Sequence, residues 1–153
     1  KGVDTAIDAC HRAGVPLTVA GDGPLRDALQ DRARRLGADV NFTGRVSTER
    51  LAALRASASV AVVPSRSAET FGLAAAEAMA AGLPVAATEI GALGELVPHE
   101  QLAPPGDPEA LAATILHARG RRDLAEEGLA RVRAHAAPEV VAPLLEAVYD
   151  GRH

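Results

Sequence analysis

The chain has 153 residues, which is the size of one domain and short for two. Hydrophobic residues make up 48% of the sequence but aromatic residues only 2%, so the core must be built from alanine, valine, leucine and isoleucine. The formal net charge of −4 argues against a broad nucleic-acid-binding surface, since such domains carry a clustered basic excess, whereas an anionic small molecule needs only a few local donors.

The cysteine count and the hydropathy bear on the compartment. Cys10 is the single cysteine, so no internal disulfide can form and a reducing compartment is expected. No apolar run reaches about 18 residues, and no secretory signal is visible. These features predict a cytoplasmic location. Because Lys1 is not a methionine and Lys1-Gly2-Val3-Asp4 already resembles the approach to a helix, we expect the sequence to be part of a longer chain.

Short apolar segments alternate with helical patterns over the first ninety residues or so. Apolar spacing predicts a helix over 3–13, closed by Gly14 and Pro16. Strands are predicted over 17–20, 40–43, 59–63 and 84–88, and further helices from near Pro24, from the N-cap Ser47 and over 73–81. Such alternation is typical of βαβ units, so the predicted fold class is α/β, a three-layer Rossmann-like domain with a parallel sheet.

The last third of the sequence has a different character. After Pro104-Pro105-Gly106 it is charged and alanine-rich, and no strand pattern follows position 103 or so. Helices are predicted over 108–118, 121–136 and 138–149, with Pro108 and Pro138 as helix starts. We expect these extra C-terminal helices to cover the sheet edge or to contact a neighbouring domain.

Ligands of open parallel sheets bind beyond the carboxyl ends of the strands, so the turns that follow the strands are candidate sites. In the first such turn, Gly21 and Gly23 allow close approach of the backbone to a ligand at a helix start. An NAD or FAD fingerprint would need a third glycine where Arg26 stands and an acid where Thr43 stands, which disfavours a dinucleotide. The alternative that Gly21 and Gly23 only allow positive φ in a turn that binds no ligand remains open.

Metal and hydrolytic sites lack a signal. The histidines are scattered without ligand spacing, at His11, His99, His117, His135 and His153. No Gly-x-Ser-x-Gly motif and no Cys/His pairing is present, so Ser65 and Ser67 are expected to be polar loop groups. Neither a metal nor a cofactor is therefore expected.

Two glutamates near the middle of the chain have different surroundings. Glu77 is the one ionisable residue between Glu69 and Glu89 and lies in a helix of small residues, so we expect it to be partly buried at a specific contact. Its carboxylate can accept two hydrogen bonds, which matches the vicinal hydroxyls of a ribose. Free amides at the helix start near Gly72 can bind a diphosphate, and Glu69, before the helix, would lie by the transferred group. Ordinary surface positions for both glutamates remain open on this chemistry alone.

A spaced pattern surrounds these glutamates. It consists of Pro64-Ser65, Glu69, Phe71-Gly72-Leu73, Glu77-Ala78-Met79-Ala80, Gly82, Pro84-Val85, Gly91 and Glu95. The pattern resembles the hallmark stretch of the retaining GT-B glycosyltransferases of the GT4 type, and the resemblance covers about positions 1–118. Thr70 and Ala92 depart from the residues usual in the family, proline or glycine at the first and glycine at the second, so the sugar pocket can differ in detail.

The resemblance implies two catalytic residues. Glu69 would contact the donor sugar. Lys1 matches the family's lysine that pairs with the diphosphate and stabilises the leaving nucleotide. The usual partner of that lysine is an arginine a few positions upstream, before the first residue of this sequence.

The resemblance also implies a set of donor-binding residues. Glu77 would bind the ribose hydroxyls, and Val46 lies in the segment that matches the family's base-side loop. The remaining donor-binding residues match backbone contacts and the first strand-to-helix turn: Phe71, Gly72, Leu73, Gly21 and Gly23.

For the protein as a whole, the resemblance implies that residues 1–153 form one donor-binding Rossmann-like domain, the C-terminal half of a GT-B fold without its N-terminal acceptor domain. The full-length enzyme would transfer a sugar from a nucleotide-sugar with retention of configuration and without a required metal, and the chain alone would be inactive. The acceptor would be a glycan, lipid or small molecule, with no nucleic acid, and the missing domain could contact a membrane. The nucleotide of the donor can be UDP, GDP or ADP. Two other functions also remain open: a non-catalytic nucleotide-sugar-binding module, and another GT-B enzyme, an epimerase or a phosphorylase.

Overall fold

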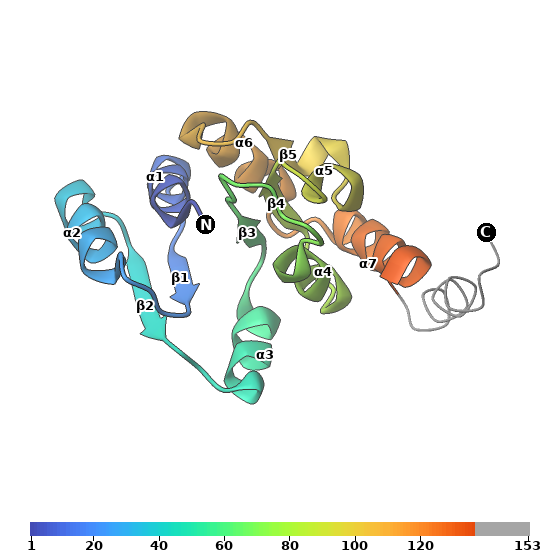
Figure 1. Ribbon diagram of the computed structural model, residues 1–153, viewed down its shortest axis with the longest axis horizontal. Helices are drawn as coiled ribbons and strands as arrows, with labels where there is room; N and C mark the ends of the chain where they lie inside the picture. Colours follow the sequence, from blue (N-terminus) through green and yellow to red (C-terminus); the bar gives the residue numbers. More distant parts are fainter. Residues whose placement is uncertain (137–153) are drawn as a thin grey trace.

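The computed structural model describes residues 1–136, and the helix predicted over 138–149, with Pro138, lies outside the described residues. The elements within them follow one another along the chain (Figure 1) as α1 (Val3–Ala13), β1 (Leu17–Ala20), α2 (Arg26–Leu36), β2 (Val40–Gly44), α3 (Thr48–Ser57), β3 (Ala61–Val63), α4 (Leu73–Ala80), β4 (Val85–Thr88), α5 (Leu93–Leu96), the 3-10 helix η1 (His99–Gln101), β5 (Leu102–Ala103), α6 (Pro108–Ala118) and α7 (Arg122–Ala136). The helices and strands predicted for this part of the chain are confirmed, with boundaries that move by at most two residues.

The boundaries follow from local chemistry. Ser47 caps α3, as predicted, because its side-chain oxygen accepts a hydrogen bond from the Arg50 amide at 3.2 Å. Asp107 caps α6 in the same way and accepts from two amides, while Pro108 occupies the first turn. Pro24 lies in the turn before α2 rather than in its first turn.

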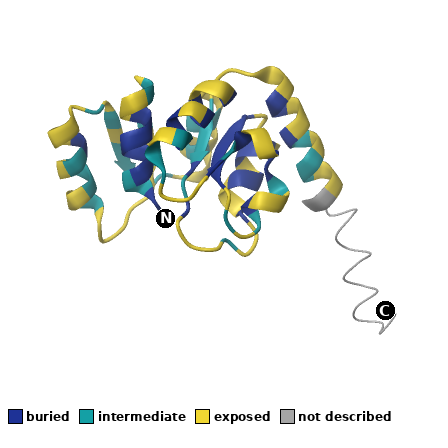
Figure 2. Ribbon diagram, turned by 90° about the horizontal axis from the view of Figure 1, so that it is seen from above, coloured by how far each residue is buried: buried dark blue, intermediate teal, exposed yellow. Residues whose placement is uncertain are grey.

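Strands β3, β4 and β5 form a parallel sheet with β4 in the middle. All four residues of β4 are buried, and the first three alternate between two cores. Val85 and Ala87 pack against α4 and α5, whereas Ala86 packs against α1 and α6. Helices therefore cover both faces of this sheet, and the buried residues gather in these layers (Figure 2). This is the predicted α/β arrangement of helix, sheet and helix.

Strands β1 and β2 form a second parallel sheet, with Leu17 opposite Val40. The sequence predicted one parallel sheet, but the described strands are divided between two. Within residues 1–136, no ladder of hydrogen bonds joins β1 to β3, and the N-terminus lies between these two strands in Figure 1. Helix α1 spans the division, because Ala9 and Cys10 belong to one core with Leu17 of β1 and with Val62 of β3.

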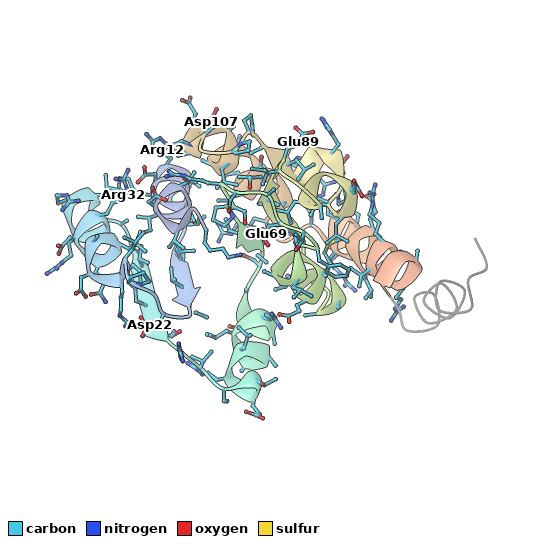
Figure 3. All side chains as sticks on the ribbon, in the orientation of Figure 1. Arg12, Asp22, Arg32, Glu69, Glu89 and Asp107 are labelled. Carbon is cyan, nitrogen blue, oxygen red and sulfur yellow. The ribbon has the colours of Figure 1, made fainter. Side chains whose placement is uncertain are left out.

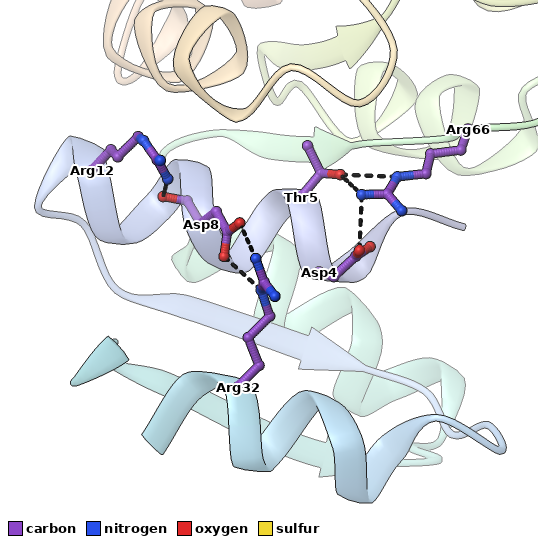
Figure 4. A network of polar contacts seen from close by, with 6 residues as sticks. All are labelled: Asp4, Thr5, Asp8, Arg12, Arg32 and Arg66. Atoms are coloured by element: carbon purple, nitrogen blue, oxygen red, sulfur yellow. Dashed lines mark hydrogen bonds and ion pairs between the residues drawn. The ribbon is translucent and has the colours of Figure 1, made fainter. Parts of the chain in front are cut away.

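Polar contacts fix α1 in this bridging position (Figure 4). Asp8 accepts a hydrogen bond from Arg32 of α2, with 2.7 Å between Nε and Oδ1, and the hydrogen bond and charge of Asp8 raise the pKa of Arg32. At the other end of α1, Arg66 donates to the Thr5 hydroxyl at 2.8 Å and pairs with Asp4 at 2.8 Å. These contacts connect α1 to α2 and to the loop that follows β3.

Candidate functional site

Lys1 and Glu69 meet although 68 positions separate them in the sequence. The Lys1 ammonium donates to Glu69 Oε1 at 2.7 Å, and the Ser65 hydroxyl donates to the same oxygen at 2.8 Å. These two hydrogen bonds, that of Lys1 first, hold the pKa of Glu69 below its ordinary value of 4.5. Glu69, in the loop between β3 and α4 (Figure 3), is therefore a carboxylate at neutral pH.

Buried contacts fix the loop that carries Glu69. Ser65 is only 2% exposed, and its carbonyl accepts a hydrogen bond of 2.6 Å from the hydroxyl of the fully buried Thr88 at the end of β4. The prediction that Ser65 is a polar group of a loop is confirmed, but the sequence did not indicate that this residue is buried. Its hydroxyl is aimed at Glu69 because its backbone is tied to the neighbouring strand.

Two glycines bring other segments into contact with this loop. Gly2 has φ +71°, and a Cβ atom there would lie 1.8 Å from the carbonyl oxygen of Pro64. Gly91 has φ +55°, and its Cβ would lie 2.6 Å from the carbonyl oxygen of Glu69. Next to it, the Ala92 amide donates to the same oxygen at 2.9 Å. Only glycine permits both the left-handed backbone and the close approach at these positions.

The lowered pKa of Glu69 predicts a pH dependence of stability. The folded chain has a lower Glu69 pKa than the unfolded chain, so this stabilisation is fully present above the ordinary value of 4.5 and is lost as pH falls through the folded value. We expect Glu69→Gln to make the acid-side fall in the free energy of unfolding shallower. Urea unfolding from neutral pH down through this window measures the effect, and parallel curves for the two proteins would contradict it.

The start of α4 lies directly after this loop. Gly72 adopts φ +76° as the N-cap, where a Cβ would lie 2.9 Å from the Leu93 side chain. The first helical hydrogen bond runs from the Ala76 amide to the Gly72 carbonyl at 3.0 Å, so the preceding amides of the first turn have no partner within α4. Phe71 is 50% and Leu73 is 63% exposed. The helix start thus offers backbone donors between two exposed apolar side chains.

Glu77, one turn further along α4, is exposed. The prediction that it is partly buried is wrong, because its side chain is 54% exposed. The apolar residues of α4 that pack into the core lie at other positions, Ala75, Ala78 and Met79 among them, which leaves Glu77 on the outer surface. The prediction of a specific contact is confirmed, since Arg55 of α3 donates to Glu77 Oε2.

An open cleft of about 830 Å³ lies beside Lys1. The start of α1, the end of β1, the turn with Gly21 and Gly23, and one side of α2 line it. Its cationic side chains come from three segments, namely the N-terminus, α2 and the loop after β3: Lys1, Arg26, Arg32, Arg35 and Arg66. The two glycines predicted to bind the donor therefore share this cleft with Lys1.

The remaining predicted site residues lie outside the lining of the cleft. They are Glu69, Phe71, Gly72, Leu73, Glu77 and Val46. Lys1 belongs to both groups, because it lines the cleft and contacts Glu69. Val46 is half-buried in the loop between β2 and α3, and the Gly21 amide donates to the Gly44 carbonyl of that region at 2.8 Å. Backbone and side-chain contacts thus connect the cleft to the loop that carries Glu69 and to the loop that carries Val46.

Sequence reasoning missed three side chains that organise the site. Ser65 and Arg66 lie two and three positions after the end of β3, and this place in a parallel sheet could have indicated a role for their side chains. Arg55 carries no such signal, since α3 has charged residues on several sides. Its role becomes visible only when α3 and α4 are placed next to each other.

In residues 1–136, no three side chains of histidine, cysteine, aspartate or glutamate gather as a metal site would require. The helices of this part of the chain are too short or too polar to cross a membrane.

A protein family and several known proteins match most of the chain. A family model described as glycosyl transferases group 1 matches residues 1–119. A glycogen synthase from Mycobacterium tuberculosis is 40% identical over 147 residues, or 90% of this chain, and a GDP-mannose-dependent alpha-(1-6)-phosphatidylinositol dimannoside mannosyltransferase from the same species is 38% identical over 141 residues, or 88%. Anabaena HepE, solved with UDP and glucose, superimposes with a TM-score of 0.84 at 26% identity over 97% of this chain.

These proteins are longer than the chain described here. The chain spans 34% of the length of the glycogen synthase, 36% of the mannosyltransferase and 45% of the HepE chain. The similarity therefore concerns one part of each relative.

Proposed function

Because the chain belongs to the family described as glycosyl transferases group 1, we propose that it is the donor-binding half of a GT-B glycosyltransferase. In this proposal residues 1–153 are one domain that binds a nucleotide-sugar. A longer protein would add the acceptor-binding half and transfer the sugar, and the chain alone would bind the donor without turning it over.

One observation carries the proposal: Lys1 and Glu69 meet at 2.7 Å beside an open cleft lined by the turn after β1. An ammonium has three donors, and the Lys1 side chain is 78% exposed, so it can contact a diphosphate while it remains near Glu69. Glu69 is ionised at neutral pH and can accept hydrogen bonds from sugar hydroxyls. The pair thus suits the point where a sugar joins its diphosphate.

The other predicted residues then take places along the same ligand. The amides of Phe71, Gly72 and Leu73 at the start of α4 would face the sugar and diphosphate, since helix N-termini favour anions. Glu77, one turn further, would bind the ribose hydroxyls. The turn with Gly21 and Gly23 would approach the phosphates, and Val46 would lie on the base side.

The mechanism proposed for the longer protein is transfer with retention of anomeric configuration. Lys1 and the backbone amides of α4 would stabilise the negative charge that develops on the leaving diphosphate, so that no metal is required for this step. Product with the inverted anomeric configuration, or activity that is lost on chelation of divalent cations, would contradict this part of the proposal.

The proposal extends to partners and location. A glycan, lipid or small molecule would be the acceptor, bound by the other half of the protein, which could contact a membrane; nucleic acid has no place in the reaction. We propose a cytoplasmic location, where Cys10 would stay reduced; burial raises the pKa of this thiol to about 11. Recovery of the longer protein from a secreted fraction would contradict this location.

Calorimetric titration of the chain with UDP-, GDP- and ADP-sugars tests donor binding directly. Related proteins name different nucleotides, GDP-mannose for the mannosyltransferase and UDP for HepE, so each base must be measured. We expect saturable binding of one donor class and weaker binding of the others. If none of the three binds at millimolar concentrations, the donor-site proposal is wrong.

A further inference from the structure

Arg55 of α3 reaches across to Glu77 of α4, where its Nη2 contacts Oε2 of the carboxylate. The two side chains are unequally covered: that of Arg55 is 24% exposed and that of Glu77 is 54% exposed. The guanidinium is therefore packed more closely than the carboxylate that it holds. The contact leaves Glu77 open to solvent on its remaining sides.

The contact also bears on the position of α3. No residue of α3, all of which the structure describes, is buried. No fully buried side chain therefore anchors this helix, and the partly exposed pair itself contributes only about 0–1 kcal/mol to stability. Because Val46 lies just before α3 and Glu77 lies on α4, the same contact connects the loop on the proposed base side with the residue on the proposed ribose side.

We propose that Arg55 is a positioning residue that holds the carboxylate of Glu77 in the orientation needed to bind the ribose of the donor. This inference rests on the proposed function, in which Glu77 binds the ribose hydroxyls. Nothing in it requires Arg55 to touch the nucleotide.

The chemistry of the carboxylate permits this arrangement. An ionised carboxylate has about four acceptor positions, so one guanidinium N–H and two ribose hydroxyls can be bound together. A glutamate side chain that is free to rotate loses rotamer entropy when it binds a ligand, and a side chain already held loses less. Arg55 would thus strengthen ribose binding without a contact of its own to the sugar, as outer-shell partners do for ligating carboxylates.

The test compares nucleotides with and without the ribose hydroxyls. UDP, GDP and ADP are titrated calorimetrically into the chain, and whichever binds is compared with its 2′,3′-dideoxy counterpart. We expect Arg55→Ala to weaken binding of the ordinary nucleoside diphosphate by about 3- to 10-fold, as befits a partly exposed pair, and to leave binding of the dideoxy form unchanged. Arg50→Ala is the matched control, because Arg50 lies exposed on the same helix. The substitution keeps the backbone amide of residue 50, which donates to the Ser47 cap.

Equal weakening for both forms of the nucleotide would overturn the inference, since Arg55 would then act on the structure as a whole. Unchanged binding would overturn it too, and tighter binding of the ordinary nucleotide would make Arg55 a competitor for Glu77. Arg55→Lys, which keeps a cation near the carboxylate, is expected to retain part of the affinity.

Glu77→Ala separates this inference from the function on which it rests. In that background, we expect Arg55→Ala to have no further effect on affinity, because its target is gone. If Glu77→Ala leaves nucleotide binding intact, the proposed role of Glu77 in donor binding is wrong. If Glu77→Ala abolishes ribose-dependent binding while Arg55→Ala does nothing, only the positioning role of Arg55 fails.

Discussion

Replacing Glu77 by alanine is expected to lower the affinity of the chain for its nucleoside diphosphate by about 100-fold or more. A hydrogen bond to a charged group contributes about 1.5–3 kcal/mol, and the proposed site has two of them, one to each ribose hydroxyl. Each 1.4 kcal/mol or so corresponds to a tenfold change in affinity. Isothermal titration calorimetry with the nucleoside diphosphate measures the loss.

The fold should survive this substitution. Glu77 is exposed and its partner Arg55 stays in contact with solvent, so we expect the free energy of unfolding to change by no more than about 1 kcal/mol. Glu126→Ala provides the matched control, since Glu126 is an exposed glutamate on a different helix, α7, outside the candidate site. Binding that is equally weak in both variants, or unchanged in Glu77→Ala, would contradict the ribose assignment.

The second large effect is expected at Gly2. Alanine in a left-handed conformation costs about 1–2 kcal/mol, and forcing an atom into a packed contact costs about 1–3 kcal/mol more. At Gly2 both apply, because φ is +71° and the added Cβ would lie 1.8 Å from the Pro64 oxygen. We therefore expect Gly2→Ala to lower the free energy of unfolding by about 2–5 kcal/mol, measured by urea unfolding.

Gly14 offers a control at the other end of the same helix. Its φ is +63°, but nothing lies within 4 Å of where its Cβ would be. Gly14→Ala should therefore lower the free energy of unfolding only by the conformational cost, about 1–2 kcal/mol. Since relief of the clash at Gly2 must move the start of α1, Gly2→Ala should also separate Lys1 from Glu69 and weaken donor binding, whereas Gly14→Ala should not. Equal losses of stability in the two variants would show that the contact with Pro64 does not matter.

The order of the elements was predictable because its signals are local. Apolar spacing predicted α1, and Pro108 predicted the start of α6. Strand β5 was missed because it has two residues, Leu102 and Ala103, too few for any periodic pattern. The division of the strands into two sheets depends on which strands lie side by side, and this information is not local to any segment.

The candidate site was predictable in part. The spacing of Glu69, Gly72 and Glu77 singled out the segment, but it carried no information on the partners of the two glutamates. Arg55 and Ser65 come from other elements or from a backbone tie to Thr88, so their roles arise from tertiary packing. The burial of Glu77 was predicted wrongly because a helix made mostly of alanines has no distinct hydrophobic face. The sequence therefore did not show which side of the helix is exposed.

The two separate sheets have a consequence for local opening of the chain. Because no strand ladder crosses from β1 to β3 within the described residues, the unit of β1, α2 and β2 can part from the rest without breaking sheet hydrogen bonds, at a lower free energy than global unfolding. A diphosphate held between the turn after β1 and the start of α4 would bind only the closed form. At about 100 times its dissociation constant, such a ligand would add about 2.7 kcal/mol to the free energy of opening. The donor would thus stabilise the association of the two sheets in addition to occupying its site.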